Sequence, residues 1–165
     1  MAKTKNSKFS IVTEFDVYES IKDLEKNDAV LLSEAQKILK NAYAPYSNFN
    51  VGAAVLLDNG KIITGNNQEN AAYPSGLCAE RVAIFYAGAQ YPKVDIKTIA
   101  ITVKSKNVII NEPLSPCGGC RQAIAEYENK SGKPIRIIMS GEKGKIYIAK
   151  SIESLLPLMF SKKYL

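Results

Sequence analysis

The clearest periodicity in the chain is helical. Apolar side chains recur at three- and four-residue spacing over residues 31–42, which predicts an amphipathic helix with Asp28 as its N-cap. Pro45 disfavours helical backbone at the residue before it and so ends this helix. Further helices are predicted over residues 78–89, residues 117–130 and, with Ser151 as its cap, residues 151–157.

Segments of strand character alternate with these helices. Asp58, Asn59 and Gly60 separate two aliphatic runs, and Asn-Gly is a strong signal for a hairpin turn. Residues 9–18 partly alternate and are rich in β-branched and aromatic side chains, which predicts an extended arm or an edge strand. The other predicted strands, the hairpin included, cover residues 51–57, 61–64, 96–104, 134–139 and 145–149. This order predicts an α/β fold, a three-layer α/β/α sandwich whose mixed sheet has about five strands.

The length of the chain bounds its organisation. At 165 residues it has the size of one domain, and we expect that domain to span residues 28–165 after an N-terminal extension of residues 1–27. No apolar run approaches the roughly 20 residues that a membrane-spanning helix needs. The basic residues 1–8 lead into no apolar run of the kind that signal peptides carry. We therefore expect a cytoplasmic protein without a membrane partner.

The cysteine and histidine counts narrow the chemistry. The chain has three cysteines and no histidine, and an odd cysteine number without a secretion signal argues against a disulfide framework. A chain without histidine cannot form a Ser-His or Cys-His triad. A closed structural zinc site of Cys and His needs four such ligands, so three thiolates leave the fourth position to water or a carboxylate. If zinc binds, these counts favour a catalytic site.

The net charge of +6 raises the question of nucleic acid as a partner. The lysines are scattered, with small clusters at residues 3–8, 104–106 and 162–163. The sequence has no basic helix face with interleaved aromatic side chains. We therefore interpret the charge as a solvated surface and expect no nucleic-acid partner.

The cysteines form two clusters, each at a predicted helix start. Cys78 opens one helix, and Cys117 and Cys120 open another. Helix N-termini favour thiolates, and two such starts can present three thiolates to one Zn²⁺ ion per subunit. Glu80 lies two positions after Cys78, where its carboxylate can reach the open coordination position without binding the metal. With Pro116 before Cys117, the pattern fits the all-cysteine form of the zinc deaminase signature.

Three other interpretations of the cysteines stay open. Cys117 and Cys120 can form a redox pair, as in thioredoxin-like motifs, but that leaves Cys78 and Glu80 without a role. Cys78 can instead be a small core residue of an apolar helix. A carboxylate can also close a non-catalytic zinc site around the three thiolates.

At these residues the sequence resembles the cytidine deaminase family of zinc-dependent nucleoside deaminases, and its short-chain homotetrameric branch in particular. The resemblance runs from about residue 35 to residue 160 and rests on five motifs in the family's order. They are Tyr43-Ala44-Pro45-Tyr46-Ser47-x-Phe49-x-Val51-Gly52-Ala53-Ala54, Asn67-x-Glu69-Asn70-Ala71-Ala72-Tyr73, Cys78-Ala79-Glu80-Arg81, Pro116-Cys117-Gly118-x-Cys120-Arg121-Gln122 and Glu153-x-Leu155-Leu156-Pro157-x-x-Phe160.

The resemblance implies hydrolytic deamination of cytidine and deoxycytidine to uridine and deoxyuridine, a step of pyrimidine salvage. Zinc would activate a water molecule, and Glu80 would move the protons of the reaction. Three thiolates leave zinc with a net charge of −1, which weakens it as a Lewis acid. Arg81 and the two helix N-termini are the available sources of positive potential that can offset this charge.

The resemblance also implies the nucleoside contacts. Asn67 and Glu69 would hydrogen-bond the ribose hydroxyls, and Phe49 would pack against the base. The remaining implied contacts are Ala79, Tyr73 and Phe160, of which Tyr73 and Phe160 would help build active sites shared between the subunits of a homotetramer. From the residues alone, the segment around Asn67 is also typical of a turn, and the aromatic side chains are also typical of a core.

Two segments depart from the family pattern or vary within it. Residues 1–27 are longer than the equivalent part of short members, and residues 74–77 vary close to the expected substrate. Three alternatives to cytidine deamination therefore stay open. They are deamination of a related amino-pyrimidine such as an antibiotic of the blasticidin type, editing of a polynucleotide, and a zinc module without enzymatic activity.

Overall fold

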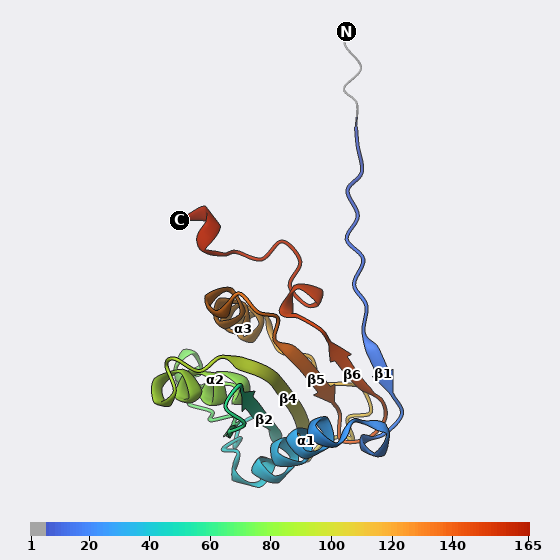
Figure 1. Ribbon diagram of the computed structural model, residues 1–165. Coiled ribbons are helices and arrows are strands. Elements are labelled where there is room, and N and C mark those ends of the chain that lie inside the picture. Colours follow the sequence, from blue (N-terminus) through green and yellow to red (C-terminus); the bar gives the residue numbers. More distant parts are fainter. Residues whose placement is uncertain (1–5) are drawn as a thin grey trace.

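The computed structural model describes residues 6–165. Their strands form one mixed sheet of six strands (Figure 1). The strand order is β1-β6-β5-β4-β2-β3, and β4 and β5 are the parallel neighbours in it. The strands are β1 (Asp16–Tyr18), β2 (Phe49–Leu57), β3 (Ile62–Asn66), β4 (Ile96–Ser105), β5 (Arg136–Ser140) and β6 (Ile146–Ala149). The predicted α/β fold is confirmed. The sheet has six strands where about five were expected, because the N-terminal extension supplies β1.

Helices cover both faces of the sheet, as the three-layer prediction requires. They are α1 (Lys26–Ile38), α2 (Ala79–Gln90) and α3 (Gly118–Ser131). Helix α1 packs on one face, and α2 and α3 pack on the other. The helix predicted after Ser151 is shorter than expected, a 3-10 turn over Ile152–Ser154. No helix in the described part of the chain is both long enough and apolar enough to cross a membrane.

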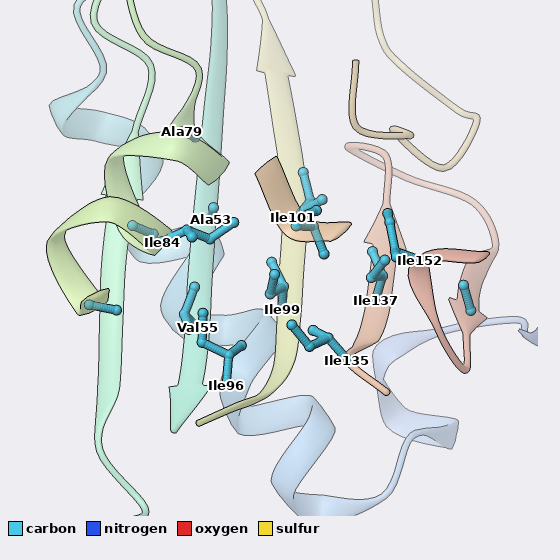
Figure 2. Close-up of a cluster of buried hydrophobic side chains, with 14 of the residues drawn as sticks. Ala53, Val55, Ala79, Ile84, Ile96, Ile99, Ile101, Ile135, Ile137 and Ile152 are labelled. Atoms are coloured by element: carbon cyan, nitrogen blue, oxygen red, sulfur yellow. The ribbon is translucent and has the colours of Figure 1, made fainter. Parts of the chain in front are cut away.

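Alternation along the strands divides the buried side chains between two cores. Ile99 and Ile101 of β4 pack with α2 and α3, whereas Ala100 between them packs beneath α1. Labelled members of the larger core in Figure 2 are Ala53, Val55, Ala79, Ile84, Ile96, Ile99, Ile101, Ile135, Ile137 and Ile152. The smaller core includes Leu31, Leu32, Ala35, Ala54, Ala100, Ile138 and Ile148. The larger core therefore holds α2 and α3 on the same face of the sheet.

The start of α1 corrects one expectation. Asp28 is not the N-cap, because the helix begins at Lys26 and Asp28 lies within its first turn. The buried Asp28 carboxylate instead accepts two hydrogen bonds from the Arg136 guanidinium, at 2.9 and 2.6 Å. This paired contact ties α1 to the start of β5. A short polar residue before an apolar run predicts a cap locally, but the ion pair spans distant parts of the chain.

The N-terminal extension is partly integrated into the fold. Residues 16–18 form β1, which pairs antiparallel with β6 at the edge of the sheet, and Phe15 packs against Tyr147 with ring centroids 6.2 Å apart. Residues 6–15 have no regular secondary structure and extend away from the sheet (Figure 1). The expectation for residues 1–8 lies mostly outside the described residues. The domain boundary at residue 28 stays a prediction.

Gly65 allows α2 to approach β3 closely. A Cβ atom at this position would lie 2.6 Å from both the Ala79 carbonyl oxygen and the Ala83 amide nitrogen. We expect Gly65→Ala to lower the free energy of unfolding by about 1–3 kcal/mol, because the helix backbone must shift. Urea unfolding measures this effect. Gly60→Asn is the control without a steric clash, since Gly60 meets no neighbour within 4 Å and asparagine accepts a positive φ at a smaller cost than most residues do. Equal unfolding midpoints for Gly65→Ala and the parent would contradict the close-packing argument.

Candidate active site

The N-termini of α2 and α3 bring the three cysteines together. Cys78 and Cys117 are the N-cap residues of α2 and α3, and Cys120 lies in the first turn of α3. Their Sγ atoms all lie within 4.8 Å of one another. The Cys78 and Cys117 sulfurs are 3.8 Å apart, and those of Cys117 and Cys120 are 3.4 Å apart. The starts of α2 and α3, which strand β4 separates in the sequence, thus lie side by side in the fold.

This arrangement fits a Zn²⁺ ion. Tetrahedral coordination with zinc–sulfur bonds of about 2.3 Å places two sulfurs about 3.8 Å apart, close to the separations of these thiols. In the described part of the chain no carboxylate joins this cluster of possible ligands. Three protein ligands with an open fourth position are the arrangement of catalytic zinc sites.

Arg81 places positive charge beside the thiols. Its Nη2 atom lies 3.7 Å from the Cys78 sulfur. The neighbouring Cys120 thiol and Arg81 lower the pKa of Cys78 to about 5, whereas the pKa of Cys120 is raised because its buried thiol lies beside that thiolate. The Arg81 Nε atom is buried and has no hydrogen-bond partner among the described residues. The surroundings of Cys78 therefore favour the ionised form that metal binding needs.

Glu80 is a buried carboxyl group in the first turn of α2. Only 4% of its surface is exposed. Burial, together with the negative charge at Cys78, raises the pKa of Glu80, while a hydrogen bond with the Cys120 thiol acts in the opposite direction. A carboxyl group with a raised pKa beside a metal site has the properties of a general acid–base.

A pocket of about 430 Å³ opens at this site. It is of the size that small-molecule sites have. Its wall includes Tyr46, Asn67, Glu69, Tyr73, Cys78 and Arg81. The structure therefore places three of the expected nucleoside contacts, Asn67, Glu69 and Tyr73, in one cavity with a candidate metal ligand.

The Asn67 side chain hydrogen-bonds to the protein backbone. Its Oδ1 accepts a hydrogen bond from the Val51 amide at 2.7 Å, and its Nδ2 donates to the Phe49 carbonyl at 2.9 Å. These bonds fix the side chain against the start of β2. A carboxamide has two N–H donors and two lone pairs on its oxygen, so one donor and one acceptor position remain for a ligand.

Glu69 organises the loop before β2. Its carboxylate accepts hydrogen bonds from the Tyr46 amide at 2.9 Å, the Ser47 amide at 3.3 Å and the Ser47 hydroxyl. Desolvation raises the pKa of Glu69, but the hydrogen bonds from Ser47 and Tyr46 outweigh it and lower the pKa below the usual value. Glu69 is thus held in its ionised, acceptor form at the pocket wall.

Three expected contact residues lie outside the wall of this pocket. Phe49 is half-buried at the first position of β2, and Ala79 is fully buried as the first residue of α2. Phe160 belongs to the C-terminal segment, where it is 57% exposed and stacks on Tyr164 with ring centroids 5.7 Å apart. A single chain does not bring Phe160 to its own pocket.

The interpretation of the sequence missed the anchoring role of the two residues after Cys120. The Arg121 guanidinium donates to the Pro116 carbonyl at 2.8 Å, the Leu155 carbonyl at 2.7 Å and the Ser115 hydroxyl at 2.8 Å. Gln122 donates to the Phe160 carbonyl at 2.9 Å. The first turn of α3 thereby holds both the loop that carries Cys117 and the C-terminal segment. The only signal in the sequence was their place in the cysteine motif.

These features define a class of protein. Three thiols fit a metal ion with an open position, a buried carboxyl group with a raised pKa lies beside them, and a pocket with polar side chains reaches the same point. This combination is that of the zinc-dependent deaminases.

Comparisons with known proteins specify the family. Residues 25–132 match the family model described as the cytidine and deoxycytidylate deaminase zinc-binding region. A cytidine deaminase of Sporosarcina psychrophila is 40% identical over 141 residues, which cover 86% of this chain and 93% of that protein. The chain therefore belongs to the cytidine and deoxycytidylate deaminase family.

Solved structures agree with this assignment. The crystal structure of cytidine deaminase from Burkholderia pseudomallei has a TM-score of 0.70 and 33% identity, with 83% of this chain and 100% of that chain covered. Cytidine deaminase from Mycobacterium tuberculosis has a TM-score of 0.63 and 30% identity, with 84% and 99% covered. The likeness spans the fold as well as the cysteine motifs.

Proposed function

We propose that this protein hydrolytically deaminates cytidine and deoxycytidine to uridine and deoxyuridine, with release of ammonia, as a step of pyrimidine salvage. The observation that carries the proposal is the cluster of Cys78, Cys117 and Cys120 beside the buried Glu80, at a pocket that also contains Asn67. We propose the cytoplasm as its location, because the three ligands must stay reduced.

The three cysteines hold one Zn²⁺ ion, which when bound supplies electrophilic activation of the attacking water. Glu80 accepts a proton from that water and donates it to N3 of the cytosine ring as C4 is attacked. It then takes the proton from the new hydroxyl group on C4 and transfers it to the departing amino group, so that the C4 carbonyl of uridine forms as the C4–N bond breaks and ammonia leaves. The raised pKa of Glu80 supports this role, because the carboxyl group must bind and release a proton within one turnover.

The nucleoside is held by the residues around the pocket. Asn67 and Glu69 bind the ribose hydroxyls, using the donor and acceptor positions that their backbone contacts leave. Phe49 packs against the base, and Ala79 borders the reacting end of the ring. These contacts favour a nucleoside with an unmodified ribose over a polynucleotide.

The aromatic residues Tyr73 and Phe160 complete active sites shared between subunits of a homotetramer. The exposure of these large side chains supports this assignment, since Tyr73 is 75% exposed and Phe160 is 57% exposed in the single chain. We expect size-exclusion chromatography with light scattering to give the mass of four chains. A monomer that is fully active would contradict the shared-site assignment.

A direct assay tests the proposed activity. The purified, zinc-loaded protein is mixed with cytidine or deoxycytidine, and the loss of cytosine absorbance is followed as uracil forms. A panel that adds a blasticidin-type nucleoside and single-stranded RNA separates the alternative substrates. Absence of turnover on both nucleosides by a zinc-loaded protein would contradict the proposal.

Arg81→Gln tests the charge offset at the metal site. We expect kcat to fall by about tenfold or more, because the positive charge beside Cys78 is lost from a partly buried, negatively charged site. Zinc retention should change as well, as measured by dialysis against a chelator. Arg81→Lys is the matched control, since it keeps the charge and should recover part of the turnover. A Gln variant with parental turnover and zinc content would show that Arg81 has no such role.

A further inference from the structure

A second cavity lies beneath the end of α1 and carries a concentration of positive charge. It has a volume of about 580 Å³, and its wall includes Lys37, Lys40, Lys104 and Lys106. None of its lining residues lines the nucleoside pocket. We call this cavity the lysine groove.

The fold explains why these four lysines meet. Lys37 and Lys40 lie three positions apart on the last turns of α1 and the 3-10 turn that follows, so they share a face. Lys104 is the next-to-last residue of β4, and Lys106 directly follows the end of that strand. In the sheet register Lys104 lies opposite Asn50, whose Nδ2 donates to the Leu39 carbonyl at 3.1 Å. The end of β4 thus faces the end of α1.

Most of the charges in the groove are not neutralised. Among the described residues no carboxylate lines the groove, and of its four lysines only Lys37 has an ion pair, with Glu34 at 2.6 Å. Away from the groove, Lys133 contacts both Asp58 and Asp95.

The C-terminus of α1 explains the position of only two of the four lysines in the lysine groove. Lys37 and Lys40 can stabilise the negative end of the α1 dipole. Lys104, near the end of β4, and Lys106, just after the strand, lie outside the helix, and the effect of the dipole falls off beyond the last turn. Converging them on the groove costs repulsion that a bound anion would relieve.

We propose that the lysine groove binds a compact polyphosphate anion. Ammonium groups donate charge-assisted hydrogen bonds to phosphate oxygens, and the cavity volume lies in the range of small-molecule sites. Within residues 6–165 no aromatic side chain lines the groove, so this part of the chain offers no stacking surface for nucleobases there. Recognition therefore rests on the phosphate chain, whether that chain is free or is the tail of a nucleotide. This site does not depend on the proposed deaminase activity.

Calorimetric titration of the zinc-loaded full chain with inorganic tripolyphosphate at low salt tests the proposal. We expect saturable binding that weakens as salt is added. In Lys104→Gln/Lys106→Gln, binding should be about tenfold weaker or more, because two charge-assisted contacts are lost. Lys93→Gln/Lys97→Gln removes the same charge from the opposite end of β4 and its preceding loop, and should bind like the parent. Because tripolyphosphate also chelates metals, zinc content is measured before and after titration.

Titrations with ATP and with single-stranded RNA identify the source of the anion. They also give results that would overturn the proposal. Similar binding of tripolyphosphate and ATP supports recognition of the phosphate chain alone, and tighter binding of ATP supports a nucleotide as its source. Absent binding, or equal weakening in both double variants, would overturn the site. Tighter binding of single-stranded RNA, lost in Lys104→Gln/Lys106→Gln, would overturn the polyphosphate assignment in favour of a nucleic-acid surface.

Discussion

Glu80→Ala is expected to lower kcat for cytidine by roughly 10²–10⁴-fold, the range for loss of a general acid–base. Glu80 is the buried carboxyl group beside the three thiols, and the chain has no histidine to take over proton transfer. Zinc content should stay at one ion per chain, because Glu80 does not belong to the ligand cluster. The loss of cytosine absorbance measures turnover, and elemental analysis measures zinc.

Glu126→Ala is the matched control for this variant. Glu126 is an exposed glutamate on α3 and should leave turnover and unfolding temperature unchanged. If Glu80→Ala turned over cytidine at the parental rate with full zinc occupancy, the proton-transfer assignment would be wrong. If its zinc were lost, the result would point instead to a structural role at the metal site.

Cys120→Ala is expected to reduce zinc content to near zero and to abolish turnover. The Cys120 side chain is fully buried beside the other two thiols, and two thiolates alone hold zinc poorly. The unfolding temperature should fall as well, since the free energy of metal binding contributes to folding stability. Elemental analysis and thermal unfolding measure the two effects.

The parent protein stripped of zinc by a chelator is the control for Cys120→Ala. Both proteins should unfold at similar temperatures, because alanine is only slightly smaller than cysteine. A variant that unfolds far below the stripped parent would indicate that the thiol acts mainly through packing. A variant that keeps its zinc would remove Cys120 from the ligand set.

Local signals predicted much of this molecule. The predicted starts of α2 and α3 agree with the structure within one residue, because the cysteines that begin each helix also mark the metal motif. The hairpin of β2 and β3 follows from its Asn-Gly turn, and pairing of these strands is observed. The spacing of apolar side chains along the sequence also distinguished the helices from the strands.

Features that depend on distant contacts could not be predicted in the same way. Asp28 has the local signature of a helix cap, yet its partner Arg136 lies on β5. The contacts of Arg121 with Leu155 and of Gln122 with Phe160 depend on where the C-terminal segment lies. The sequence around Asn67 was compatible with either a turn or a ligand contact. The hydrogen bonds from its side chain to the β2 backbone form only in the folded sheet.

The sheet separates two cores, and this division has a consequence for protein engineering. The cysteines and Glu80 belong to the side of α2 and α3, whereas the Leu31 and Leu32 side chains pack on the far side of the sheet. Substitutions at distant, independent sites add in their effects on stability. Repacking the core beneath α1 is therefore a route to a more heat-resistant catalyst whose reaction centre keeps every contact it has now.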